Sequence, residues 1–161
     1  MERGCLGIDI GGTSVKLGLF DGEGMLLEKW SIPTNRNQNG AEIIPDIAAS
    51  VRRKLQQLEI EPAQLTGIGV GVPGQVSEDG MVLLAENLGW ENVPLMRELS
   101  ERTGLPVSAE NDANLAALGE SWKGSARHCH SMMLVTLGTG IGCGIVVKGQ
   151  ILTGVHGAAG E

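Results

Sequence analysis

The chain has 161 residues, of which 42% are hydrophobic and 19% charged, and its formal net charge is -7. This length suits one domain, or one domain and part of a second, and the composition is that of a globular protein. The acidic balance argues against a nucleic-acid-binding surface, and no apolar stretch is long enough to span a bilayer. We therefore expect neither nucleic acid nor a membrane among its partners.

The cysteines and the N-terminus indicate a cellular compartment. Cys5, Cys129 and Cys143 are odd in number and widely spaced, which favours a reducing cytoplasm over a disulfide framework. The N-terminus lacks the apolar core and cleavage site of a signal peptide, and strand-like sequence begins almost at once. We expect a cytoplasmic protein with no DNA-binding module before the first strand. The "HCH" at 128–130 has no second pair at zinc-like spacing, so we expect a surface loop there.

The elements expected in chain order alternate between strands and helices. Apolar runs with β-branched residues predict strands, and apolar residues that recur every three or four positions predict helices. Strands are expected at 4–10, 13–20, 25–32, 65–72, 106–110, 131–138, 145–149 and 150–154, helices at 41–58, 94–102 and 111–122, and irregular chain at 33–40 and 75–93. The order βββαβαβα followed by βββ predicts an α/β arrangement of layers.

The chain contains an internal repeat at a shift of 127 positions. "IDIGGTSVKLGLFDG" then lies over "VTLGTGIGCGIVVKG" without a gap, which places Gly11 on Gly138 and Gly22 on Gly149. We infer a duplicated architecture, in which residues 1–124 form the first unit. Residues 125–161 begin the second unit, which breaks off after three strands.

The glycine turns at the two ends of this repeat predict an anion site. A strand–turn–strand unit with glycine at its tip lets backbone N–H groups approach a phosphate without a Cβ in the way. Thr13 and Thr139 would add hydroxyl donors, and Lys16 a cation. Asp9, at the end of the first strand, suits Mg²⁺ held through water. Taken alone, either glycine turn is as often an ordinary hairpin as a phosphate-binding turn. The predicted phosphate-binding residues are Asp9, Gly11, Gly12, Thr13, Lys16, Gly138, Thr139 and Gly140.

Six segments in order resemble the motifs of the ROK-type bacterial sugar kinases, and are most similar to the ATP-dependent glucokinases of that family. They are "DIGGTSVKLGLFD", "GVPGQV", "ENLGW", "ENDANLAALGE", "LVTLGTGIGCGI" and "GVHGAAGE". The resemblance implies a ribonuclease H-like α/β fold of the actin and hexokinase type, with two lobes around a cleft. This chain would supply the N-terminal lobe and the first strands of the second. The family also implies ATP and Mg²⁺, a homodimer, and a structural Zn²⁺ whose ligands lie beyond residue 161.

The resemblance also assigns the sugar-binding side. It implies that Asp112 is the base for the sugar hydroxyl. Because a helix N-terminus is partly positive, its place in a first helical turn favours the ionised carboxylate. The competing interpretation is that Asn111 or Asp112 merely caps the helix. The residues implied to bind the sugar are Gly71, Asn87, Asn111 and Glu161, and Gly74 would help to bring the chain close to it.

The predicted function is ATP-dependent phosphorylation of a hexose, with glucose converted to glucose 6-phosphate as the favoured reaction. Residues 1–161 alone are expected to be inactive. The alternatives are a kinase for fructose or N-acetylmannosamine, a sugar-binding transcriptional repressor of the same family, and an actin-like or chaperone-type ATPase.

Three further residues near these motifs have open roles. Trp90 would either stack beneath a sugar or pack between the lobes. Cys143 stands where the family usually has glycine, and would crowd the second turn if its side chain points inward. His156 is expected to be a loop residue without a role in the site.

Overall fold

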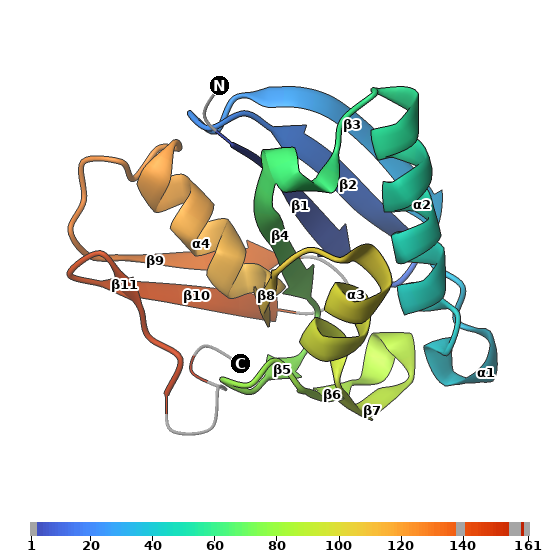
Figure 1. Cartoon of the computed structure of the whole chain (residues 1–161). Coiled ribbons are helices and arrows are strands. Elements are labelled where there is room, and N and C mark those ends of the chain that lie inside the picture. Colours follow the sequence, from blue (N-terminus) through green and yellow to red (C-terminus); the bar gives the residue numbers. More distant parts are fainter. Residues whose placement is uncertain (1–2, 138–140, 155–158, 160–161) are drawn as a thin grey trace.

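A five-stranded sheet forms the centre of the computed structural model, which describes residues 3–137, 141–154 and 159 (Figure 1). Its strand order is β3-β2-β1-β4-β8. The strands are β1 (Gly4–Ile10), β2 (Ser14–Phe20), β3 (Leu26–Pro33), β4 (Leu65–Val72) and β8 (Val107–Asn111). β1, β2 and β3 are antiparallel neighbours, whereas β4 and β8 run parallel to β1. The carboxyl ends of β1, β4 and β8 therefore meet at one edge of the sheet.

The core lies between this sheet and two helices, α2 (Ile43–Gln57) and α3 (Leu95–Thr103). Successive side chains of a strand alternate between faces, so β1 buries Leu6, Ile8 and Ile10 in this core. The opposite face carries glycines of β1, β2 and β4, and α4 (Asp112–Trp122) packs on that side beside β4 and β8 (Figure 1). One face of the sheet is thus tightly covered and the other is partly open.

The C-terminal strands form a separate antiparallel sheet, which α4 joins to the central one. It consists of β9 (Met132–Leu137), β10 (Ile141–Val147) and β11 (Gln150–Ile151), in the order β11-β10-β9. A Cβ added at Gly144 would lie 2.6 Å from the Ala117 Cβ, so this glycine lets β10 approach α4 closely. The proposed boundary near residue 124 stays a prediction, because α4 contacts both sheets.

The far end of α4 is fastened to the turn between β2 and β3. Lys123 Nζ donates a hydrogen bond of 2.8 Å to the Glu23 carbonyl. A Cβ at Gly24 would overlap the Trp122 ring, and Gly24 has a φ of 75°, which favours glycine. The helix is therefore held to the central part of the molecule at its carboxyl end.

The segment 75–93, expected to be irregular, instead forms a small antiparallel sheet. Its strands are β5 (Gln75–Val76), β6 (Val82–Ala85) and β7 (Trp90–Val93), with a short turn of helix at Glu86–Leu88. The prediction was wrong because strands of two to four residues are too short to show alternation. Short helical turns also occur at α1 (Asn37–Gly40) and at Pro62–Gln64.

The strands of the repeat are confirmed, but the residues that pair next to the turn differ between the two hairpins. β10 begins at Ile141, which is 127 positions after Ser14, the first residue of β2. In the first hairpin Ile10 pairs with Val15, whereas in the second Leu137 pairs with Ile141. The second hairpin is therefore one residue shorter around its turn. Within the described residues, none of the helices combines the length and apolar character that a membrane crossing requires.

Candidate active site

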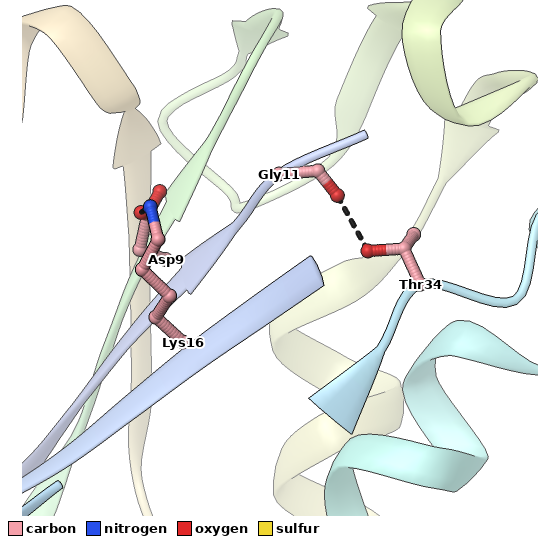
Figure 2. A network of polar contacts seen from close by, with 4 residues as sticks. All are labelled: Asp9, Gly11, Lys16 and Thr34. Atoms are coloured by element: carbon pink, nitrogen blue, oxygen red, sulfur yellow. Dashed lines mark hydrogen bonds and ion pairs between the residues drawn. The ribbon is translucent and has the colours of Figure 1, made fainter. Parts of the chain in front are cut away.

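The turn between β1 and β2 brings together five of the predicted phosphate-binding residues. Asp9 and Lys16 are directly paired across the hairpin, and Lys16 Nζ lies 3.1 Å from Asp9 Oδ2 (Figure 2). Both side chains are about half exposed. The Gly11 N–H donates to the Ser14 carbonyl at 3.1 Å, and a Cβ on Gly11 would lie only 2.9 Å from that oxygen. Glycine at position 11 is thus required by the turn itself.

Gly12 and Thr13 complete this turn, and Gly12 lies next to a predicted sugar-binding residue. A Cβ added at Gly12 would be 3.8 Å from the Asn87 Cβ, which is an ordinary contact distance. Asn87 comes from the helical turn between β6 and β7 and is exposed. The structure therefore places the predicted phosphate turn beside one of the residues implied to hold the sugar.

The start of α4 separates the roles of Asn111 and Asp112. The Asn111 side-chain oxygen accepts hydrogen bonds from the N–H groups of Ala113 and Asn114, at 2.8 and 3.1 Å. Asn111 is only 5% exposed, and its Nδ2 donates to the Gly74 carbonyl at 3.2 Å. Capping, the competing interpretation, is therefore confirmed for Asn111. Its contact with a sugar stays a prediction.

The Asp112 carboxyl responds to several opposing influences. Although Asp112 borders solvent, partial burial of its carboxyl is the largest influence and raises its pKa above the ordinary 3.8. The Ala113 N–H, which donates to Oδ1 at 2.8 Å, lowers the pKa, and the negative charge of Asp9 raises it. The net direction is upward. The N–H groups at the start of α4 favour the ionised form, as expected, but burial and the charge of Asp9 outweigh them.

Asp9 and Asp112 line the same cavity, which has a volume of about 440 Å³. Gly71 of β4 and Thr136 of β9 also border it. This arrangement follows from the fold, since the carboxyl ends of β1, β4 and β8 meet at one edge and α4 starts directly after β8. The residue predicted as the base and the residue predicted for Mg²⁺ thus face one space.

Gly71 and Gly74 have different surroundings, which explain the absence of a side chain at each position differently. A Cβ at Gly71 would lie 3.7 Å from the Asp112 Cα and 3.4 Å from Leu115 Cδ1, so the strand passes close to the start of α4. A Cβ at Gly74 would lie 2.9 Å from the Ala85 Cβ. Packing of the β4–β5 turn against β6 therefore accounts for Gly74 without a ligand.

Two residues with open roles are placed by the structure. Trp90 is buried in the core of the central part, and its Nε1 donates to the Gly40 carbonyl at 3.1 Å, so it neither stacks on an open site nor packs between lobes. Cys143 pairs with Val135, on the strand face opposite Gly142 and Gly144 and hence away from α4. The segment 128–130 is exposed, as expected for a surface loop.

Five predicted or weighed residues lie outside the described part of the chain. They are Gly138, Thr139, Gly140, His156 and Glu161. The second turn and the final sugar-binding carboxylate stay predictions.

Sequence reasoning did not single out Thr34 and Thr136, which the structure places at the site. Thr34 contacts the Gly11–Thr13 turn, and Thr136 borders the shared cavity. The repeat held a signal for Thr136, since a shift of 127 positions places it on Asp9. No such signal existed for Thr34, whose partner lies 23 positions away in the chain.

Comparison with known proteins identifies the family. The sequence pattern of the ROK family matches residues 5–161. The chain is 45% identical to a glucokinase of Halalkalibacterium halodurans, across 99% of this chain and 49% of that protein. It is 35% identical to a putative xylose repressor of a Caldicellulosiruptor species, across 97% of this chain and 39% of the repressor. The crystal structure of a ROK family glucokinase from Streptomyces griseus, in complex with glucose and AMPPNP, matches with a TM-score of 0.86 and 34% identity, covering 98% of this chain and 49% of that one.

The chain belongs to the ROK family. Its closely similar relatives include glucokinases, and it has the actin and hexokinase type of α/β ATPase fold, as the sequence predicted. The chain spans about half the length of the glucokinases that it matches.

Proposed function

We propose that the protein carrying this chain phosphorylates a hexose with ATP, and that glucose is its preferred substrate. The observation that carries this proposal is the cavity shared by Asp9 and Asp112. One carboxylate lies beside a glycine turn suited to phosphates, and the other lies at the start of a helix, where it can meet a sugar hydroxyl. Similarity to glucokinases supports the same reaction.

In this proposal Asp112 orients the sugar hydroxyl and accepts its proton as the phosphoryl group is transferred. Its raised pKa fits that role, because a carboxylate with a higher pKa is a stronger base. Asn87, Asn111 and Glu161 hold the sugar through its hydroxyls, since amide and carboxylate groups each bind adjacent hydroxyls. Gly71 leaves room for the sugar beside Asp112.

The phosphates are held by the backbone N–H groups of the 11–13 turn, with Lys16 as a cation and residues 138–140 as the opposing turn. Packing against the described residues does not require glycine at position 12, which is consistent with a ligand that approaches the backbone there. Asp9 supplies an oxygen ligand of the kind that Mg²⁺ prefers, on the cavity that Asp112 shares. When bound, Mg²⁺ would neutralise phosphate charge.

The remaining family properties are part of the same proposal. They are a cytoplasmic location, a homodimer, and a structural Zn²⁺ held by residues beyond position 161. We also propose that residues 1–161 do not turn over alone, because residues 125–161 supply only the first strands of the second lobe.

A second candidate is a sugar-binding repressor, which the similarity to a putative xylose repressor favours. Such a protein would hold a sugar in the same place without transferring phosphate. The Asp112 carboxyl, with its raised pKa, fits a base better than a residue that only binds.

The test is sugar-dependent ADP release by the full-length protein, measured with glucose, fructose and N-acetylmannosamine. We expect the rate of ADP release to saturate with sugar concentration, and kcat/KM to be highest for glucose. Sugar binding without ADP release would establish the repressor instead, and a higher kcat/KM for another hexose would overturn the choice of glucose.

A further inference from the structure

Thr34 holds the glycine turn from outside the hairpin. It directly follows Pro33, the last residue of β3, and is half-buried. Its Oγ1 donates a hydrogen bond of 2.6 Å to the Gly11 carbonyl (Figure 2), and its backbone N–H donates one of 3.0 Å to the Thr13 carbonyl. The residue directly after β3 therefore binds two of the three carbonyls in the turn.

These bonds fix the direction of the turn's N–H groups. A trans peptide is planar, with its C=O and N–H pointing in opposite directions. The carbonyl of Gly11 and the N–H of Gly12 belong to one peptide. When the Thr34 hydroxyl holds that carbonyl, the Gly12 N–H must point away from Thr34. No hydrogen bond joins the Gly12 N–H to another described residue.

We propose that Thr34 is a positioning residue that orients the Gly11–Gly12 peptide so that its N–H binds the phosphates of the nucleotide. The inference rests on the proposed function, since it gives this turn its ligand. A turn free to rotate would often present the Gly11 carbonyl to the phosphates, where two negative groups repel. The hydrogen bond from the Thr34 hydroxyl prevents this rotation.

The backbone bond of Thr34 does not require threonine, but the side-chain bond does. Pro33 has no N–H, so the pairing of β2 with β3 ends at Ser14 and Pro33, and the next N–H along the chain is that of Thr34. Any residue except proline would extend the pairing to the Thr13 carbonyl. Only a hydroxyl or another short donor at this position also reaches the Gly11 carbonyl.

The chain offers a matched control at the other end of β1. Thr66 Oγ1 donates a hydrogen bond of 3.0 Å to the Gly4 carbonyl, again from a threonine hydroxyl to a glycine carbonyl of a neighbouring segment. Gly4 is the first residue of β1, so this bond lies at the opposite end of the strand from the turn, and neither of its partners is a predicted site residue. A purely structural bond of this kind is therefore available for comparison.

The experiment compares Thr34→Val, Thr34→Ser and Thr66→Val in the full-length protein. Isothermal titration with AMPPNP and ADP gives Kd, and initial rates give KM for ATP and for the sugar. Because one hydrogen bond contributes modestly in water, we expect Thr34→Val to weaken nucleotide binding about three- to tenfold. The KM for the sugar should be unchanged, Thr34→Ser should restore the affinity, and Thr66→Val should bind as the wild type does.

Equal nucleotide affinity in wild type and a folded Thr34→Val would overturn the inference while leaving the proposed function intact. If Thr34→Val does not fold, Thr34→Cys provides the measurement, since a thiol is a weaker donor of similar size, and unchanged affinity there has the same meaning. A wild-type protein that binds no nucleotide would instead overturn the proposed function, and this inference with it.

Discussion

The β1–β2 and β9–β10 hairpins share a sequence pattern but differ in how they are buried. In the first hairpin one face lies wholly in the core, where Leu17 is 1% exposed. In the second, the face with Gly142 and Gly144 lies against α4, and the opposite face is open. On that open face Leu137 is 81% exposed and Ile141 76% exposed.

This difference teaches that a repeated pattern predicts strands and turns but not what covers them. The apolar face of β1 and β2 packs against α2, whereas β10 packs against α4 only through the face with Gly142 and Gly144, and the described helices leave the face with Leu137 and Ile141 open. Contiguous exposed apolar surface marks a place where further protein packs. The relatives are about twice as long as this chain. We therefore expect substitutions in the second hairpin to have different effects in residues 1–161 and in the full-length protein, and substitutions in the first hairpin to have similar effects in both.

The largest expected effect is at Asp112, which shares a cavity with Asp9 of the first hairpin and Thr136 of the second. In the full-length protein, Asp112→Asn should fold normally, because the side chains are nearly the same shape, and should lose about 10²- to 10⁴-fold in kcat through loss of the base. Steady-state kinetics with glucose and ATP measures this. Asp46→Asn is the control, since Asp46 is an acidic residue in the first turn of α2. Retained turnover in Asp112→Asn would remove the assignment of the base.

The next effect compares burial in the two hairpins directly. In residues 1–161, Leu17→Ala should lower the free energy of unfolding by about 2–5 kcal/mol, because it leaves a cavity in the core. Met133→Ala, at a side chain that is 63% exposed, should change it by less than about 0.5 kcal/mol.

Urea denaturation measures both changes, and the pair is repeated in the full-length protein. There we expect further protein to cover the open face of β9 and β10, and the cost of Met133→Ala to rise as a result. Equal costs for Leu17→Ala and Met133→Ala in residues 1–161 would contradict the comparison.

A smaller effect is expected where the second hairpin contacts α4. Gly144→Ala should destabilise the protein by about 1–3 kcal/mol, because the new Cβ would collide with the helix. Gly119→Ala, on the same helix with nothing near its added Cβ, should stabilise it by about 0.5–1 kcal/mol. Thermal unfolding distinguishes the two. A neutral Gly144→Ala would show that α4 and β10 are not tightly packed.

The smallest effect concerns pH. Since burial and Asp9 raise the pKa of Asp112, the acid limb of kcat/KM should lie above the range of an ordinary aspartate. Asp9→Asn removes a negative charge that helps to raise the pKa of Asp112. The acid limb of the variant's residual kcat/KM should therefore move to lower pH. An unmoved limb in Asp9→Asn would show that Asp9 does not act on Asp112.

The same shift affects stability. The folded state binds the Asp112 proton more tightly than the unfolded state, so this stabilisation is present at low pH and is lost as pH rises from about 3.8 through the raised value. Asp112→Asn should therefore unfold at a slightly higher temperature than the wild type at neutral pH.

Periodicity was sufficient to predict the sheet and its helices. β1, β2, α2 and α4 have long or alternating apolar patterns, and their bounds lie within a few residues of those expected. The small sheet of β5, β6 and β7 was missed, because strands of this length are determined by their neighbours and not by their own pattern.

Part of the membership of the candidate site was predictable, but its electrostatics were not. The turn residues and Asp112 were found from glycines, spacing and resemblance. The sequence revealed the helix N-terminus at Asp112 but not the desolvation or the nearness of Asp9, which come from folding β1 next to β4. Likewise it did not decide that Asn111 is the residue at the N-cap of α4. Each of these depends on contacts between segments distant in the chain.

The attachment of α4 at both ends limits how the site can move. Its start is bound to the Gly74 carbonyl through Asn111, and its end to the β2–β3 turn through Trp122 and Lys123. The helix must therefore travel with the central sheet as one rigid body. Any motion of the second sheet relative to the central one therefore has to bend the connection after Lys123 and shift β10 along α4 at Gly142 and Gly144, where the two elements pack closely.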